Sequence, residues 1–167
     1  MVSTRTLLGL GLAVIAVVSL TTIVVVQQMA LQRHVLINYY GYVFTEFGDC
    51  KPSTGYVFLV LWISVQNVGY DSVPTALAGF GNPYPYYFYL AVGNQQFNGF
   101  PLRCQSSNEI LPMTNVTNGL TVSGFLTFEV PANFESFTLI YRPPSGNYNV
   151  QYVNQGFTAG TVSTATA

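Results

Sequence analysis

The chain has 167 residues, of which half are hydrophobic and only 7% are charged. Its formal net charge of −1 argues against a nucleic-acid-binding protein, which needs clustered Lys and Arg to displace counterions from phosphates. An ordinary soluble domain has about 25% charged residues, so this surface must be built largely from Asn, Gln, Ser, Thr, Tyr and Gly.

The N-terminal segment carries no charge between Arg5 and Arg33. Residues 6–26, TLLGLGLAVIAVVSLTTIVVV, would span about 30 Å as a helix, which matches the hydrocarbon core of a bilayer. A cleaved secretion signal has a shorter apolar core, of about 7–15 residues, and a small-x-small site after it. The exit at residues 27–31 is a poor site, and cleavage at 14–16 would cut inside the apolar run. We expect residues 1–33 to form a retained membrane helix, with a removed signal as the alternative, and the rest of the chain to lie outside the cytoplasm.

From His34 onward, apolar residues recur with period two and turn residues separate the runs, as in strands. We expect strands at 35–45 and 56–67. Both alternate faces of the second run are apolar, which is typical of a central strand that is covered on both sides. One face carries Val57, Leu59, Leu61, Ile63 and Val65, and the other carries Phe58, Val60 and Trp62.

Gly, Pro and Tyr dominate residues 69–100, where Pro83 and Pro85 exclude an interior strand. A loop should therefore lead into a strand at 86–92, which a turn at Gly93-Asn94 connects to QQFNGF. Residues 119–141 hold two alternating runs joined by Pro131-Ala132-Asn133, a hairpin-like unit with Gly124 as a candidate bulge. A last strand is expected within YNVQYV. The expected shared core comprises Val57, Leu59, Leu61, Trp62, Leu126, Phe128 and Leu139, with Leu120, Val122, Val130, Phe137 and Tyr141 on the same faces.

About seven short strands at this spacing predict an all-β, two-sheet sandwich over residues 34–154, followed by a polar tail at 155–167. Cys50 and Cys104 form an even pair in an exported domain, so a disulfide between them is expected, with two buried free thiols as the alternative.

Two stretches also carry a resemblance. GYVFLVLWISVQNVG and GLTVSGFLTFEVPANFESFTLIY resemble the immunoglobulin-like sandwich of exported prokaryotic proteins, over about residues 55–153. Arg5, the apolar segment and a β domain rich in Tyr, Thr and Asn resemble the plan of archaeal pilins. That resemblance implies a helix packed into a filament core and an immunoglobulin-like head facing solvent. The chain departs from the plan at its processing site, where Arg5-Thr6 replaces a basic residue followed by Gly or Ala.

Residues suited to catalysis or metal binding are few. His34 is the only His, whereas zinc and copper sites need three or four ligands, and a cupredoxin-like copper site would need a His near Met113. Among the acidic residues only Glu46 and Asp49 are close in sequence; a calcium site there is the alternative to solvated loop charges. We therefore expect no enzyme activity, no metal and no cofactor.

Tyrosines are the remaining signal, because they bury a large area while keeping a polar group, which suits protein contacts and sugar stacking. The alternative is that some are core residues and the rest are scattered over the surface. Asn115-Val116-Thr117 is a candidate glycosylation site at Asn115. The candidate interface residues are Tyr39, Tyr40, Tyr84, Tyr86, Tyr87 and Tyr89.

These patterns favour a non-enzymatic cell-surface protein, a subunit of a pilus-like or thread-like filament that contacts the membrane through residues 6–26 and associates with itself or with another membrane or surface protein. In such a filament residues 27–45 would be ordered by another copy. One alternative is a single-span accessory subunit of a membrane-bound redox complex. Another is a stand-alone adhesive or carbohydrate-binding module.

Overall fold

The computed structural model describes residues 33–76, 86–101, 109–144 and 146–158, with side chains described up to residue 156. Contacts divide the chain into two units, Met1–Arg33 and His34–Ala167, and all described strands belong to the second. The predicted N-terminal helix lies outside the described residues. None of the helical turns within the described ranges is long and apolar enough to cross a membrane.

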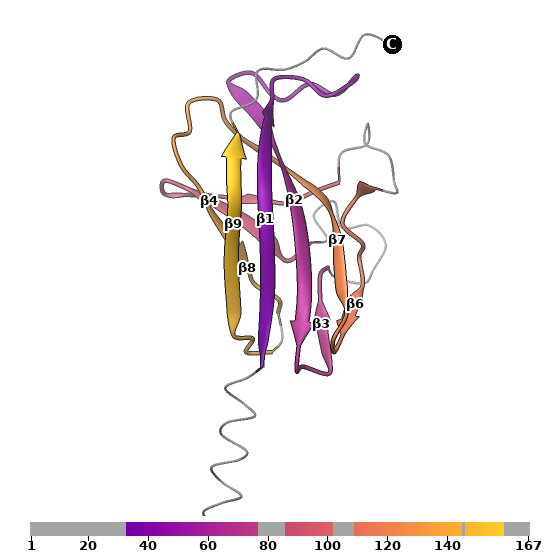
Figure 1. Cartoon of the computed structure of the whole chain (residues 1–167). Coiled ribbons are helices and arrows are strands. Elements are labelled where there is room, and N and C mark those ends of the chain that lie inside the picture. The colour runs from indigo at the N-terminus through magenta and orange to yellow at the C-terminus, as the bar shows by residue number, and fades with distance from the viewer. Residues whose placement is uncertain (1–32, 77–85, 102–108, 145, 159–167) are drawn as a thin grey trace, which may run out of the picture. The chain divides into compact units, whose positions relative to one another are not determined.

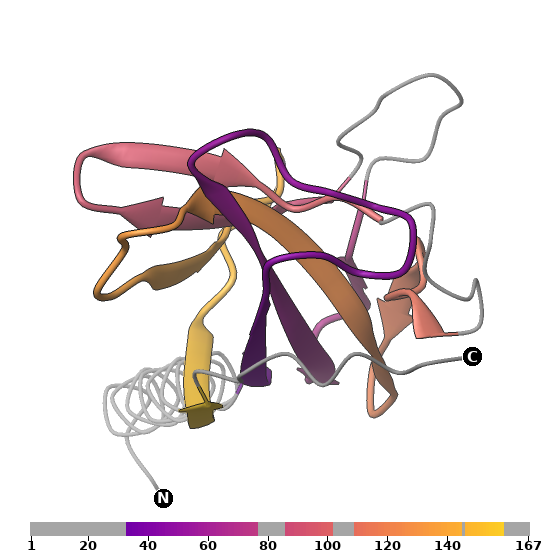
Figure 2. The ribbon, with the colours of Figure 1, turned by 90° about the horizontal axis from the view of Figure 1, so that it is seen from above.

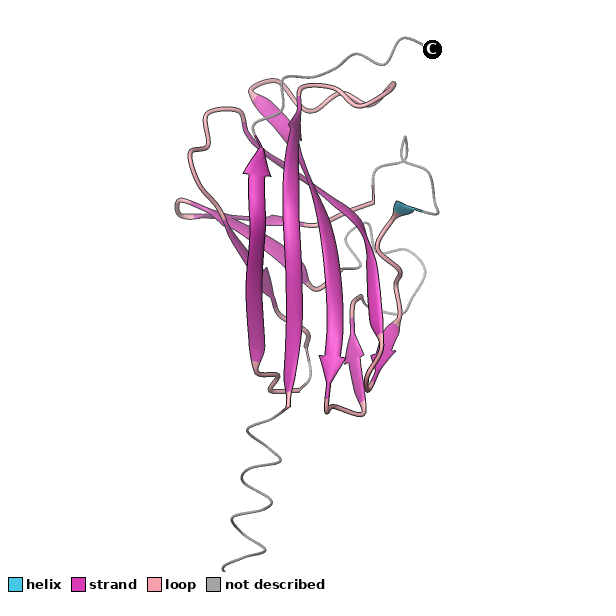
Figure 3. Cartoon of the chain, in the orientation of Figure 1, coloured by secondary structure: helices cyan, strands magenta, loops and turns pink. Residues whose placement is uncertain are grey.

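The described part is all-β and contains three sheets (Figures 1 and 3). A four-stranded sheet has the order β7-β2-β1-β9, a three-stranded sheet the order β5-β4-β8, and β3 pairs with β6. The strands are β1 (His34–Phe44), β2 (Tyr56–Val68), β3 (Ser72–Pro74), β4 (Phe88–Val92), β5 (Gln95–Asn98), β6 (Asn115–Thr117), β7 (Thr121–Pro131), β8 (Thr138–Tyr141) and β9 (Val150–Thr158).

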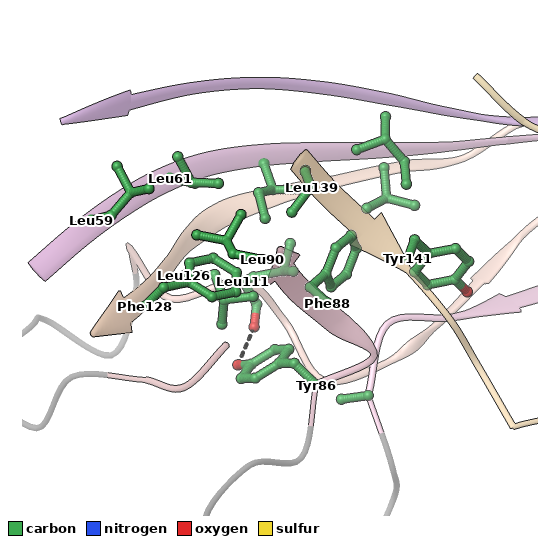
Figure 4. Close-up of a cluster of buried hydrophobic side chains, with 14 of the residues drawn as sticks. Leu59, Leu61, Tyr86, Phe88, Leu90, Leu111, Leu126, Phe128, Leu139 and Tyr141 are labelled. Atoms are coloured by element: carbon green, nitrogen blue, oxygen red, sulfur yellow. Dashed lines mark hydrogen bonds between the residues drawn. The ribbon is translucent and has the colours of Figure 1, made fainter. Parts of the chain in front are cut away.

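The hydrophobic core is formed by one face of the four-stranded sheet, which we call the inner face, together with side chains of the other two sheets. Because side chains alternate along a strand, the odd-numbered residues of β2 from Val57 to Val65 all point into this core. Phe88, Leu90 and Leu139 meet them from the three-stranded sheet (Figure 4). Figure 2 shows the ribbons of β4, β5 and β8 to one side of the four-stranded sheet. Each fully buried side chain of this size contributes about 1.5–3 kcal/mol relative to exposure.

Six of the seven residues of the expected shared core are confirmed as buried, whereas the prediction that Trp62 belongs to this core is wrong. Trp62 lies on the opposite, outer face of β2 and is half-buried. Leu120 is 58% exposed because it precedes β7, whereas Thr127, whose hydroxyl suggests an outward position, is fully buried. The reason is that the outer face is itself covered near Thr127, where Phe100 forms a bridge to it.

The hairpin expected at 119–141 does not form. β7 pairs with β2 in an unbroken antiparallel register from Thr121↔Gln66 to Pro131↔Tyr56, whereas β8 pairs with β4 in the other sheet. The connection between β7 and β8 is longer than a tight turn and packs Phe134 and Phe137 against the core, so the chain crosses between sheets.

Gly124 is not a bulge, because the register of β2 and β7 continues through it. A side chain at Gly124 would instead collide with the backbone of Ile110 and Leu111, which passes directly over the strand. The irregularity of this sheet lies between β1 and β9, which run parallel and shift register between Tyr39 and Gly41. β9 continues to Thr158, beyond the end predicted at residue 154.

Candidate interaction surface

Three aromatic residues form a row across the outer face of the four-stranded sheet. Tyr40 of β1 is paired with Trp62 of β2, and Trp62 is paired with Phe125 of β7. The rings of Tyr40 and Trp62 are stacked, with centroids 5.3 Å apart and an interplanar angle of 16°. Paired residues of neighbouring strands point to the same side of a sheet, so their side chains stand next to one another.

The aromatic row continues along β1 towards the loop that follows it. Tyr40 and Tyr42 meet edge to face at 5.7 Å, Tyr42 and Phe44 lie 6.4 Å apart, and Phe44 and Phe47 meet edge to face at 5.2 Å. We call the set Tyr40, Tyr42, Phe44, Phe47, Trp62 and Phe125 the aromatic face. Offset and edge-to-face pairs of this kind stabilise one another by about 0.5–1.5 kcal/mol beyond the area they bury.

A hollow of about 300 Å³ opens in the aromatic face. On the same face, under these rings, Phe58 and Val60 are buried and form a second, smaller hydrophobic cluster. A shallow, apolar hollow suits an apolar side chain from a partner better than a polar reactant. The hollow is lined by Tyr42, Phe44, Phe47, Val60, Glu109 and Phe125.

Part of the remaining outer face is polar without charge. Next to the aromatic row, Asn38 of β1, Ser64 of β2 and Ser123 of β7 occupy paired positions. Gln66 and Thr121 form the following pair. Along β2 and β7 the face therefore changes from aromatic rings to hydroxyl and amide groups, which carry no charge.

Of the tyrosines predicted as interface residues, Tyr40 belongs to the aromatic face. Tyr39 points the other way, packs against the core and lies 6.3 Å from Phe137. Tyr87 and Tyr89 are half-buried on β4 or next to it, and Tyr84 lies outside the described residues.

Tyr86 is a core residue rather than a surface residue. It is 2% exposed, and its hydroxyl donates a hydrogen bond of 2.6 Å to the backbone carbonyl of Leu111 (Figure 4). Burial raises the pKa of Tyr86 to about 12.

Most members of the aromatic face were not predicted as site residues. The available signal was the run 56–67, in which both alternate faces are apolar at the first end and the second face turns polar after Trp62. A strand that is apolar on both faces only over part of its length indicates a partly covered outer surface.

A second hollow, of about 410 Å³, lies between β5 and the ends of β2 and β7. Its lining combines aromatic rings, two amides, a hydroxyl and one carboxylate. Glu129 accepts a hydrogen bond from the backbone N–H of Ser53. The hollow is lined by Ser53, Tyr56, Gln96, Phe97, Asn98, Phe100 and Glu129.

Within the described ranges, no three His, Cys, Asp or Glu side chains are grouped so that they could hold a metal ion. Glu46 and Asp49 are exposed on the turn after β1, and His34 begins β1. Cys50 is disulfide-bonded. Its expected partner Cys104 lies outside the described residues, so that pairing stays a prediction. The intact mass of the protein before and after reduction tests it.

Asn115 is exposed at the start of β6. Its glycosylation stays a prediction.

Neither a protein-family model nor a curated protein matches the chain. Among solved structures, the chain is similar to a "putative lipoprotein (ycdA)" from Bacillus subtilis, with a TM-score of 0.46 and 20% sequence identity. The match covers 67% of this chain and 31% of that one, so the chain spans about a third of that protein's length. A likeness at this level carries no argument about function.

Proposed function

We propose that the chain is a non-enzymatic cell-surface structural protein, in which an immunoglobulin-like β-sandwich is held outside the membrane by the apolar N-terminal segment. Its role in this proposal is that of a subunit of a pilus-like filament, in which the aromatic face packs against neighbouring subunits. The observation that carries the proposal is the aromatic face, which combines the exposed Tyr42 and five half-buried rings with an apolar hollow. Among the described residues that line this hollow, Glu109 is the one acidic side chain, so no group of acids and bases of the kind that catalysis requires is found there.

The position of β1 supports an anchored head. β1 begins at His34, directly after the unit that ends at Arg33, so the apolar segment is joined to the sheet through this strand. β1 lies inside the sheet, antiparallel to β2 along its whole length and parallel to β9. A force applied through the N-terminal segment would have to break backbone hydrogen bonds on both edges of β1. Such a connection suits a domain that is held by its first strand.

The chemistry of the aromatic face supports contacts with protein rather than with an ionic surface. Aromatic residues are enriched in the centres of protein interfaces, and charged residues are depleted there. Tyr42 is 40% exposed and lines the hollow, so a partner side chain seated there would bury it.

The test is to extract the full-length protein from native membranes in mild detergent and to image it. We expect abundant self-assembled filaments, and we expect Tyr42→Lys to abolish them without changing the circular dichroism of the domain. Gln95→Lys, at an exposed position on β5, is the matched control and should assemble normally. Recovery of the protein in fixed ratio with a larger membrane complex would instead support the accessory-subunit alternative, and a monodisperse monomer would contradict both.

A carbohydrate-binding role is the second candidate, and the 410 Å³ hollow favours it. Sugar C–H groups pack on aromatic faces, and sugar hydroxyls exchange hydrogen bonds with amides and carboxylates. Tyr56, Gln96 and Glu129 offer these groups together. Calorimetry with cellohexaose, using the wild type and Tyr56→Ala, measures it: binding lost in the variant would support this role, and no heat from the wild type would remove it.

A further inference from the structure

The two edges of the four-stranded sheet differ in their protection. The β7 edge is covered by the chain itself, because Phe100 and Thr127 exchange backbone hydrogen bonds of 2.9 and 3.1 Å. The N–H of Leu111 also donates to the carbonyl of Phe125, at 3.0 Å. At the other edge of the sheet, no described strand pairs with the side of β9 that faces away from β1 (Figure 1).

β9 lacks most of the devices that keep an edge strand from pairing with another chain. Natural edges are blunted by short strands, charged residues, prolines or bulges. β9 runs from Val150 to Thr158 without a charged residue or a proline, and Tyr152 and Val153 are 41% and 43% exposed. Its one irregularity is a bulge near Gly156, whose N–H donates to the side-chain oxygen of Asn154. The regular part of the open edge is therefore Val150–Asn154.

The backbone groups that remain available on this edge can be assigned. The N–H of Val35 donates to the carbonyl of Asn149, which fixes the parallel ladder. In such a ladder alternate residues turn their backbone groups to the neighbour, so those of Gln151 and Val153 face β1. The N–H and C=O groups of Tyr152 and Asn154 point outward.

β9 is also fixed in position, so its free edge is already ordered for pairing with another strand. The hydroxyl of Tyr152 accepts a hydrogen bond of 2.8 Å from the backbone N–H of Tyr141 in β8. This bond ties the strand to the three-stranded sheet, so little conformational entropy remains to be lost on pairing.

We propose that Val150–Asn154 of β9 pairs antiparallel with the same strand of a second copy of the chain. A row of outward N–H and C=O groups is satisfied best by another strand. A second copy fits because a two-fold axis places two strands without any charged residue opposite one another, so no like charges meet. This inference rests on the proposed function, since it names one partner of the surface-displayed domain.

The geometry of the pair limits how the two copies can be anchored. A two-fold axis that relates antiparallel strands in one sheet stands perpendicular to that sheet. The outer faces of both copies then lie on the same side, and the two β1 strands, each continuous with residues 1–33, begin at opposite ends of the joined sheet. Two copies that are anchored on surfaces facing one another satisfy this arrangement. The pair would therefore join two such surfaces rather than neighbouring subunits of one filament.

The experiment uses the full-length protein reconstituted in phosphatidylcholine liposomes, with clustering followed by light scattering. We expect wild-type liposomes to cluster, and we expect Val153→Lys, which places two like charges at diagonal positions of the pair, to reduce clustering roughly tenfold or more. Gln95→Lys puts the same charge on the edge strand β5 and should cluster like the wild type. Absence of wild-type clustering, or clustering that Val153→Lys leaves unchanged, would overturn the proposal.

Hydrogen exchange gives a second readout that does not depend on a variant. On clustering, the amides of Tyr152 and Asn154 should slow by roughly tenfold or more, whereas those of Gln151 and Val153, already bonded to β1, should change little. Equal exchange in clustered and dispersed liposomes would exclude β9 as the contact. Filament imaging of Val153→Lys separates the two proposals, because filaments that persist when clustering is lost leave the proposed function standing.

Discussion

The inner and outer faces of the four-stranded sheet are built from the same strands but are closed by different means. On β2, Leu59, Leu61 and Ile63 are fully buried because the other sheets cover the inner face. On the outer face, the described residues that bury Phe58 and Val60 are aromatic side chains and residues of the loops after β1 and β5, and Trp62 is left half-buried. A face covered by a sheet stabilises the fold, whereas a face covered by a few rings keeps area available for a partner.

The largest test of this comparison uses two neighbouring residues of β7. Leu126 is fully buried on the inner face, and Phe125 is half-buried on the outer face. Leu126→Ala should lower the free energy of unfolding by about 2–5 kcal/mol, because it leaves a cavity in a closed core. Phe125→Ala should cost clearly less despite removing more atoms. Thermal unfolding followed by circular dichroism measures both, and equal losses would mean that the outer face is closed as well.

The sequence pattern predicts the strands of this sheet, but it does not predict which face of the sheet is buried by another sheet. Alternation along 56–67 predicts the β2 strand and its two apolar faces, yet nothing local says which of them another sheet will cover. Trp62 was therefore expected in the core, although the register places it beside Tyr40. Similarly, the runs on either side of Pro131 predict two strands, but the partners β2 and β4 are set by contacts distant in sequence.

The tyrosines show the same limit in the candidate site. The dense run at 84–89 indicates aromatic surface, but half of an alternating run faces inward, and Tyr86 is among the residues that do. Tyr40 was found because it is aromatic, and its neighbour Phe125 was missed because it reaches the aromatic face only through pairing with Trp62.

The next test concerns the place where the chain closes the β7 edge. Gly124→Ala should destabilise the protein by about 1–3 kcal/mol, because the new Cβ would meet the backbone of Ile110 and Leu111, which is hydrogen-bonded and cannot move aside easily. Gly99→Ala is the matched control. Its Cβ would meet the side chains of Leu126 and Phe128 rather than backbone, and side chains shift more easily than hydrogen-bonded backbone, so its cost should be smaller. Urea unfolding ranks the two, and the reverse order would show that this edge is loosely covered.

A smaller effect is expected from the buried hydroxyl on the inner side. Tyr86→Phe leaves the carbonyl of Leu111 without this donor and should cost about 1–2 kcal/mol at neutral pH. The variant should also change the alkaline limb of the stability curve. Tyrosine in the unfolded chain ionises near pH 10, whereas the pKa of Tyr86 in the folded chain is raised to about 12.

The sign of this pH effect follows from which state releases its proton first. The contribution of Tyr86 is complete below about pH 10 and is lost as the pH rises towards about 12, because the unfolded state ionises first. Tyr86→Phe should therefore lose stability less steeply over this range than the wild type. Leu126→Ala, which destabilises without removing a titrating group, should keep the wild-type slope. An unchanged slope in Tyr86→Phe would place this hydroxyl in contact with water.

The smallest effect, with the opposite sign, is expected on the outer face at Thr127. This side chain is fully buried, and its hydroxyl has no hydrogen-bond partner among the described residues. Thr127→Val replaces the unpaired hydroxyl with a methyl group of similar size and should raise the free energy of unfolding by up to about 1 kcal/mol.

Thr75 is the matched control, because it is equally buried but its hydroxyl contacts the carbonyl of Pro112 at 2.6 Å and accepts from the N–H of Thr114 at 2.9 Å. Thr75→Val should destabilise, so the two substitutions move the melting temperature in opposite directions. If Thr127→Val also destabilised, water would reach this hydroxyl, and the outer face would be open even where Phe100 crosses it.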